Sequence, residues 1–239
     1  MRCKKLLVIL MILISIIAFF ICLDLLLKDF QELNRNNEST ENLIEESIEI
    51  NDETEEIKIN WDYLKSINED IIAWIEIAGT NINYPILKDD NVYYLKHSFD
   101  KKYNNNGSIF TTNMFPFEEP ETIVYGHNMK NGSMFSNLSK YMDKDFLHSH
   151  LEFNIYTPNA NYIATIFSVY SIGIENENNN IKTLDFRERI EYYKNASKYT
   201  IDSNYNINKI VKLTTCSYLN QKERPTEQRY YIIANLNQI

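Results

Sequence analysis

Cysteine is scarce in this chain of 239 residues, which contains only Cys3, Cys22 and Cys216. The first two lie in or beside an apolar run at the N-terminus, so Cys216 is the one thiol in the polar part of the chain. A disulfide framework needs pairs of cysteines in the folded region, which this sequence lacks. A lone thiol is either an inert core residue or a nucleophile, and the residues around it must decide between the two.

A basic patch is also lacking, and no nucleic-acid-binding motif is present, so we expect no binding to DNA or RNA. The formal charge of −9 arises in one segment, residues 29–56, which holds 11 acidic residues and one basic residue. The acidity therefore belongs to that segment and does not indicate a binding face. Hydrophobic residues make up 44% of the chain and aromatic residues 13%, enough for a packed core.

The N-terminus has the pattern of a membrane anchor. Arg2, Lys4 and Lys5 precede Leu6–Leu23, an apolar run of 18 residues that would form a helix about 27 Å long, close to the thickness of the hydrocarbon core. A cleavable signal peptide is the alternative, but no small-x-small cleavage site follows the run. We therefore predict a single membrane-spanning anchor within residues 1–27, which contacts the membrane through residues 6–27. The basic N-terminus would stay in the cytoplasm and the rest of the chain would lie outside.

The acidic segment after the anchor, residues 28–57, is predicted to be a linker. Its scattered Leu and Ile residues give only a weak amphipathic pattern, so a helical stalk and a disordered tether both remain open. We expect the folded domain to occupy residues 58–239.

This domain is predicted to be mainly β with helical insertions. Short apolar and β-branched runs indicate about eight strands with short connections, which favours a closed or nearly closed barrel over an alternating βαβ sheet. The predicted strands are Ile71–Ile77, Ile82–Ile86, Ser108–Thr112, Thr122–Tyr125, Leu151–Thr157, Tyr162–Ile172, Ile210–Thr215 and Arg229–Leu236. The predicted helices are a short one capped by Asn60, one over Asn131–Tyr141, and one over Leu184–Lys198 with Thr183 as its N-cap.

Three residues at strand ends could carry chemistry. Cys216 directly follows an apolar strand, and a nucleophilic cysteine needs a base and a group that stabilises an oxyanion. His127 comes just after another apolar strand, beyond Gly126, so it is the best candidate for the base. Arg229 opens the last strand, which would pair beside the strand of Cys216, whereas the alternative Arg224 lies in a charged loop.

The other histidines have ordinary interpretations. His97 is expected at the surface or in a local hydrogen bond, and His148 and His150 lie in what we expect to be a polar connection. His-x-His can ligate a metal, but no third ligand of suitable spacing is nearby, so we expect no metal site.

The motifs together resemble the sortases, and more narrowly the class B sortases. Four stretches in the family's order carry the resemblance: Leu213–Cys216 resembles the Thr-Leu-x-Thr-Cys signature, Tyr125–Asn128 the histidine segment, Arg229–Ala234 the arginine strand, and Asn68–Pro85 with Tyr93–Leu95 the class B N-terminal region. Lys212 stands where the signature usually has threonine, and we expect its side chain to face away from the groove.

The resemblance implies an eight-stranded sortase-type barrel with an N-terminal helix and a helix between strands six and seven. It also implies a cysteine transpeptidase that cleaves an Asn-Pro-x-Thr type of C-terminal sorting motif on secreted proteins. Cys216 would form a thioacyl enzyme, an amine of a lipid-linked peptidoglycan precursor would resolve it, His127 would be the acid and base, and Arg229 would stabilise the oxyanion. Substrate contacts would come from Ile181, Leu213, Thr214 and Thr215, and no cofactor is implied.

Three other functions share parts of this pattern. A papain-like hydrolase would normally carry its cysteine near the start of a helix. A pilus-type sortase would use a lysine side chain as the amine, and it usually has an added lid-like region that is not evident here. A membrane-tethered binding protein with an inactive motif would have the same anchor and linker.

Overall fold

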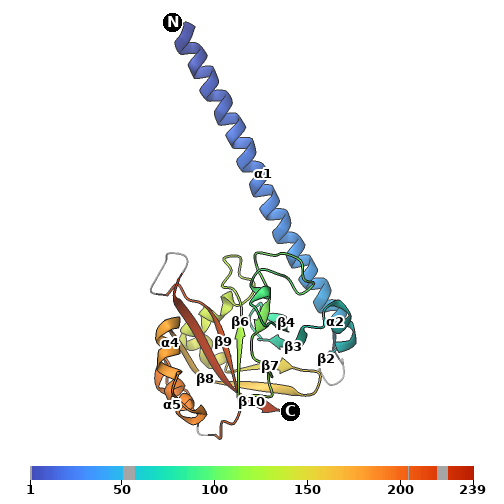
Figure 1. Cartoon of the computed structure of the whole chain (residues 1–239), viewed down its shortest axis with the longest axis vertical. Coiled ribbons are helices and arrows are strands. Elements are labelled where there is room, and N and C mark those ends of the chain that lie inside the picture. The colour runs from blue at the N-terminus through green and yellow to red at the C-terminus, as the bar shows by residue number, and fades with distance from the viewer. Residues whose placement is uncertain (1, 51–56, 204, 220–225) are drawn as a thin grey trace.

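The computed structural model describes residues 2–50, 57–203, 205–219 and 226–239. Figure 1 shows a long N-terminal helix, α1, that projects from a β-barrel flanked by shorter helices. The helices are α1 (Arg2–Ser47), α2 (Trp61–Ile67), α3 (Lys144–Ser149), α4 (Ile174–Ile181) and α5 (Phe186–Ala196), with short 3₁₀ helices η1 (Tyr93–Leu95) and η2 (Ser136–Met142). The strands are β1 (Ile48–Ile50), β2 (Ile57–Ile59), β3 (Ile71–Glu76), β4 (Asn83–Lys88), β5 (Ile109–Thr111), β6 (Glu121–Tyr125), β7 (Glu152–Tyr156), β8 (Asn161–Gly173), β9 (Ile210–Cys216) and β10 (Gln228–Gln238).

Strands β3 to β10 close into a barrel in the order β10-β8-β7-β3-β4-β5-β6-β9. Most neighbours are antiparallel, but β6 runs parallel to β9, with Tyr125 opposite Thr214. Two parallel neighbours end at the same edge of a sheet, so the residues that follow β6 and β9 come together there. This topology confirms the predicted eight-stranded barrel and sets the position of the site.

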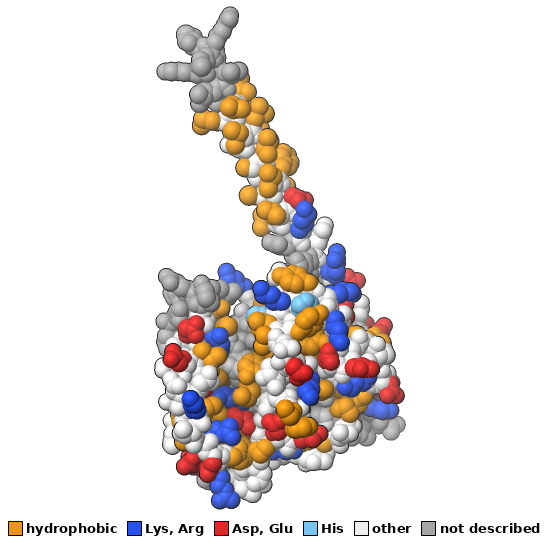
Figure 2. All heavy atoms as spheres, in the orientation of Figure 1, with side chains coloured by type: hydrophobic (Ala, Val, Ile, Leu, Met, Phe, Trp, Pro, Cys, Tyr) orange, Lys and Arg blue, Asp and Glu red, His pale blue; other side chains and the backbone are white. Residues whose placement is uncertain are grey.

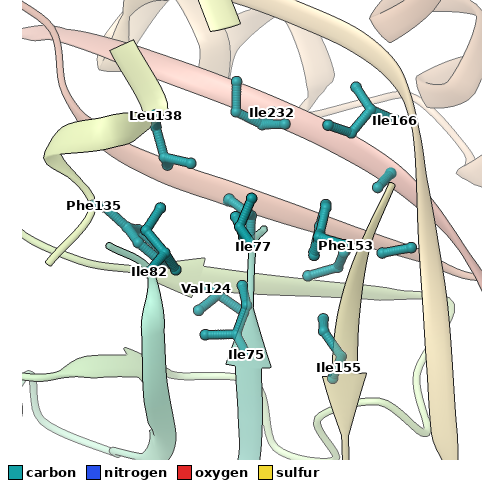
Figure 3. Packing of buried hydrophobic residues seen from close by; sticks show 14 of the residues in the cluster. Ile75, Ile77, Ile82, Val124, Phe135, Leu138, Phe153, Ile155, Ile166 and Ile232 are labelled. Carbon is teal, nitrogen blue, oxygen red and sulfur yellow. The ribbon is translucent and has the colours of Figure 1, made fainter. Parts of the chain in front are cut away.

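The barrel interior is filled by aliphatic and aromatic side chains. Residues alternate between the two faces of a strand, so Ile232 and Ala234 of β10 face inward while Ile233 packs on the outside. Figure 3 shows Ile232 directed at the same space as Ile75 and Val124, which come from other strands. Burial of each large apolar side chain contributes about 1.5–3 kcal/mol to stability, so this cluster is the main core.

Two helical layers cover the outside of the barrel, on opposite sides in Figure 1. Helix α2 and the end of α1 pack around the buried Trp74 of β3. Helices α4 and α5 cover β8, β9 and β10 around Tyr170 and Tyr193. The second layer lies over the strand that ends in Cys216.

All eight predicted strands are confirmed, with boundaries that differ by a few residues at most. Asn60 caps α2 as predicted, since its side chain accepts a hydrogen bond from the backbone N–H of Tyr63 at 3.1 Å. The N-cap of α5 is Asp185 and not Thr183, because Asp185 forms a capping box with Glu188.

Two other predictions about helical segments were wrong. The helix expected over Asn131–Tyr141 is a loop followed by the 3₁₀ helix η2, Ser136–Met142. The polar connection expected around His148 is the short helix α3, which Asp143 caps by accepting hydrogen bonds from two backbone N–H groups. Positive φ angles at Gly132 and Met134 interrupt the first expected helix, and the Asp143 cap starts the second segment as a helix.

The N-terminal helix holds the predicted apolar run. Residues 9–28 form a helical stretch with a mean hydropathy of 3.0 and none of it buried, so it is a candidate membrane span or signal anchor. Figure 2 shows apolar side chains covering this part of the helix.

The segment predicted as a linker contributes to packing, although its amphipathic pattern is weak. Leu43 is almost fully buried near Trp74, and β1 pairs with β2 so that Ile48 lies opposite Ile59. The division into anchor, linker and catalytic domain stays a prediction.

Candidate active site

The ends of β9 and β10 bring Cys216 and Arg229 together. Cys216 is the last residue of β9, partly exposed, and it lies directly opposite Arg229 in the antiparallel ladder. Opposite residues in such a ladder have their side chains on one face, with Cβ atoms about 4.5–5.5 Å apart. The Arg229 guanidinium donates hydrogen bonds to the carbonyls of Thr226 at 2.6 Å and Gln228 at 2.9 Å, which hold it at this rim. The alternative Arg224 lies outside the described residues.

The end of β6 brings His127 to the same place. The backbone N–H of Gly126 donates to the Thr214 carbonyl at 3.3 Å, and the side-chain amide of Asn128 donates to the Cys216 carbonyl at 2.7 Å. His127 lies between these two contacts, so the parallel register of β6 and β9 continues past the strands and sets His127 beside Cys216. The three predicted catalytic residues therefore come from three neighbouring strand ends.

The orientation of His127 follows from a hydrogen bond between its Nε2 and the carbonyl oxygen of Leu95, at 2.8 Å. A carbonyl oxygen only accepts, so Nε2 carries a hydrogen and Nδ1 is the nitrogen that can exchange a proton. The loop that holds Leu95 is packed tightly, since a Cβ at Gly107 would lie 2.6 Å from the same carbonyl oxygen. The positive φ of +59° at Gly107 also favours glycine there.

The expected substrate-contact residues fall into two groups. Thr214 lies on the outer face of β9 with Cys216, and Ile181 ends α4 and packs partly against the cluster under α4 and α5. Leu213, in contrast, is fully buried in the barrel interior, and its contact with substrate stays a prediction. Thr215 shares that inward orientation, because strand residues alternate and its partner Tyr230 belongs to the interior cluster.

Lys212 also departs from the prediction. We expected its side chain to face away from the groove, but it lies on the outer face of β9, the face of Cys216, beneath α4. It forms an ion pair there with Glu177, and both side chains are almost fully buried.

Sequence reasoning did not single out Asn128, Leu95 or Glu177 as functional. Asn128 directly follows His127 in the histidine segment, and this position is the one feature of the sequence that could have indicated a role for it. Leu95 acts through its backbone carbonyl, and Glu177 lies in a run of Asn and Glu residues that looks like a solvated loop, so no residue-type pattern marks either one. Within the described ranges, no group of three or more His, Cys, Asp or Glu residues is placed to hold a metal ion.

Comparison with known proteins identifies the class to which this fold and site belong. Residues 75–237 match the sortase domain family, and the chain belongs to this family. Its relatives are class B sortases, which makes this chain a class B sortase. The match excludes a papain-like hydrolase and does not favour the pilus-type alternative.

The similarity extends over the barrel in both sequence and structure. Sortase B of Listeria monocytogenes is 40% identical over 162 residues, which cover 64% of this chain and 65% of that protein, just under two thirds of its length. The structure of sortase B from Bacillus anthracis has a TM-score of 0.68 and 29% identity, covering 88% of this chain and all of that chain. A sortase B–substrate complex from Staphylococcus aureus has a TM-score of 0.64 and 26% identity, covering 74% of this chain and 84% of that chain.

Proposed function

We propose that this chain cleaves a C-terminal sorting motif of the Asn-Pro-x-Thr type on secreted proteins and joins them to a peptidoglycan amine. The observation that carries the proposal is the convergence of three strand ends, with Arg229 opposite Cys216 and His127 fixed beside them by Asn128. A Staphylococcus aureus relative was solved as a substrate complex, which supports the proposal that this chain also binds a substrate.

In the first half of the reaction, the Cys216 thiolate attacks the threonyl carbonyl and the scissile peptide bond breaks. Arg229 stabilises the oxyanion that forms, because its guanidinium is already held at the rim by backbone carbonyls. His127 gives a proton from Nδ1 to the leaving amine, and the product is a thioester on Cys216.

In the second half, an acceptor amine attacks the thioester and His127 takes the proton from it. The amine displaces the Cys216 thiolate, so a new amide bond forms and the enzyme returns to its starting state. The acceptor is proposed to be a lipid-linked peptidoglycan precursor.

Residues 1–27 would hold this domain at the membrane, with the N-terminus in the cytoplasm and the catalytic domain outside. Three basic residues before the apolar run support that orientation. Residues 28–57 would link the anchor to the catalytic domain over residues 58–239. A membrane-impermeant maleimide added to intact cells should therefore label Cys216, and Cys216→Ala should remove the label.

The chemistry is tested with the full chain in detergent micelles and a peptide library of the form Asn-Pro-x-Thr-x. Mass spectrometry should find the acyl group on Cys216, and added triglycine or hydroxylamine should convert it to the amide or hydroxamate. Cys216→Ala should lower product formation by at least about a thousandfold without unfolding the protein. Acylation at another residue, or hydrolysis that is indifferent to the amine, would contradict the proposal.

A further inference from the structure

A buried ion pair lies on the outer face of the barrel, on the strand that ends in Cys216. Lys212 is four residues before Cys216 in β9, so the two side chains share a face. The Lys212 side chain is 3% exposed and its ammonium contacts the carboxylate of Glu177 in α4, which is 1% exposed. The transpeptidase reaction described above uses neither residue.

The carboxylate of Glu177 joins α4 to three other elements. One oxygen accepts hydrogen bonds from Lys212 of β9 and from the Tyr170 hydroxyl of β8 at 2.7 Å. The other oxygen accepts from the Tyr192 hydroxyl of α5 at 2.9 Å. Burial raises the pKa of Tyr170, which therefore stays a neutral donor. These side-chain hydrogen bonds of Glu177 thus link α4 to β9, β8 and α5.

Lys212 is also held by aromatic rings of α5 and β10. Its ammonium lies 4.8 Å from the ring centroid of Tyr193 and 4.6 Å from that of Tyr231, within the range of cation–π contacts. The hydroxyl of Tyr193 donates in turn to Glu121 at 2.7 Å, and Arg189 forms an ion pair with the same carboxylate at 2.6 Å. Four charges of balancing sign therefore lie between the helices and the barrel.

Helix α4 has little else to hold it against the barrel. Its sequence is Ile-Glu-Asn-Glu-Asn-Asn-Asn-Ile, and Glu177 is the one buried residue among these eight. A surface helix normally docks through an apolar stripe, which this helix lacks apart from its two terminal isoleucines. The position of α4 therefore depends on the bonds of Glu177.

Helix α4 also begins at the rim of the active site. β8 pairs with β10, so Ile172 lies opposite Arg229, and the backbone N–H of Ile174 donates to the Glu227 carbonyl at 2.9 Å. Arg229 is in turn opposite Cys216 on its other side. The first turn of α4 is thus close to the groups that would bind and cleave the peptide.

We propose that Lys212 and Glu177 are positioning residues that seat α4 as one wall of the substrate groove and so set the affinity for the sorting peptide. The inference rests on the proposed function for its substrate. Neither residue touches the reacting atoms, so loss of the pair should weaken peptide binding and leave the reactivity of Cys216 unchanged.

The test compares four variants of the full chain in detergent micelles: Glu177→Gln, Lys212→Met, the double variant with both changes, and Glu191→Gln. Glu191 is an exposed residue of α5, so Glu191→Gln makes the same change of charge outside α4 and without touching the pair. The measurements are kcat and KM with Asn-Pro-x-Thr-x peptides and triglycine, hydrogen exchange of the α4 amides, and the rate of Cys216 alkylation by iodoacetamide.

The expected result is a rise in KM of about tenfold with kcat within about twofold for the variants that remove the pair. Their α4 amides should exchange faster, alkylation should keep its normal rate, and Glu191→Gln should match the unmodified protein. The double variant keeps the test valid if a single variant unfolds, because removing both charges leaves no unpaired buried charge.

A folded double variant with unchanged KM and unchanged protection of α4 overturns this inference alone. A failure of the proposed function looks different, since the unmodified chain itself would then form no amine-dependent product. In that case the exchange data still decide whether the pair seats α4.

Discussion

The barrel interior and the layer between the barrel and α4/α5 are both nearly closed to water, but they are built from different chemistry. The interior cluster is held by apolar contacts, with residues such as Ile75 and Ile232 fully buried. The α4/α5 layer combines apolar residues with the pairs Lys212–Glu177 and Arg189–Glu121. An apolar contact tolerates small shifts, whereas a buried charge needs its partner in place. The interior therefore gives the fold its stability, and the polar layer fixes one helix relative to the catalytic strand.

The largest effect on stability should come from removing one charge of the polar layer. Lys212→Met leaves the Glu177 carboxylate buried without its cation, and we expect a loss of about 3–5 kcal/mol in the free energy of unfolding. The further change Glu177→Gln should restore most of that loss, as measured by urea unfolding in a double-mutant cycle. If the losses from Lys212→Met and Glu177→Gln were simply additive, the polar layer would respond to mutation in the same way as the barrel interior.

The interior should show a comparable loss without any rescue. Ile232→Ala leaves a cavity at a fully buried position, and the free energy of unfolding should fall by about 2–5 kcal/mol. Ile239→Ala, at a position that is 70% exposed, is the matched control and should change stability little. A second truncation next to Ile232 should add to the loss, in contrast to the pair above.

The hydrogen bond from Asn128 to the Cys216 carbonyl lies between the barrel interior and the active site, and its removal should have a smaller effect. Asn128→Ala removes the hydrogen bond to the Cys216 carbonyl, which is worth about 1 kcal/mol, so kcat/KM should fall by about five- to tenfold with little change in melting temperature. Asn131→Ala, an exposed asparagine on the same loop, is the control. Unchanged kcat/KM in Asn128→Ala would mean that the position of His127 does not depend on this bond.

The smallest effect should come from an exposed pair on the opposite side of the barrel. Partial burial raises the pKa of Asp70, but hydrogen bonds from Tyr94 and Lys101 outweigh it, and the net result is a pKa below the usual value of 3.8. A lowered folded-state pKa adds stability above the unfolded value, and this stability is lost as the pH falls through the folded value.

Asp70→Asn should therefore cost less than about 1 kcal/mol at neutral pH, because solvent screens the pair. The difference from the unmodified protein should vanish below the folded pKa of Asp70. Chemical unfolding at a series of pH values measures both, and a difference that grows towards low pH would contradict the assignment.

The same contrast explains what could be predicted from the sequence. The eight strands and the closed barrel were predictable because each strand is a short apolar and β-branched run, as in Ile232, Ile233 and Ala234. Cys216, His127 and Arg229 could be identified because each adjoins such a strand and because the family motifs coincide there. The apolar runs of the strands thus predicted most of the fold and the positions of the candidate site residues.

The features that could not be predicted depend on single polar contacts between distant segments. Nothing local marks Glu177 as buried, because its partner Lys212 is 35 residues away along the chain. The carbonyl of Leu95 has no side-chain signature, although it orients His127. The burial of Leu43 could not be predicted for a related reason, since it packs in one cluster with Trp74 of the barrel.

Helix α1 runs without a break from the apolar segment to Ser47, where the backbone N–H of Asn60 donates to the Ser47 carbonyl at 2.8 Å. The stretch from Lys28 to Ser47 is about 30 Å long at 1.5 Å per residue. In a continuous helix, each residue added between the apolar segment and the barrel would rotate the barrel by about 100° about the helix axis. The number of residues between Lys28 and Ser47 therefore sets both the distance of the groove from the apolar segment and the direction in which the groove opens.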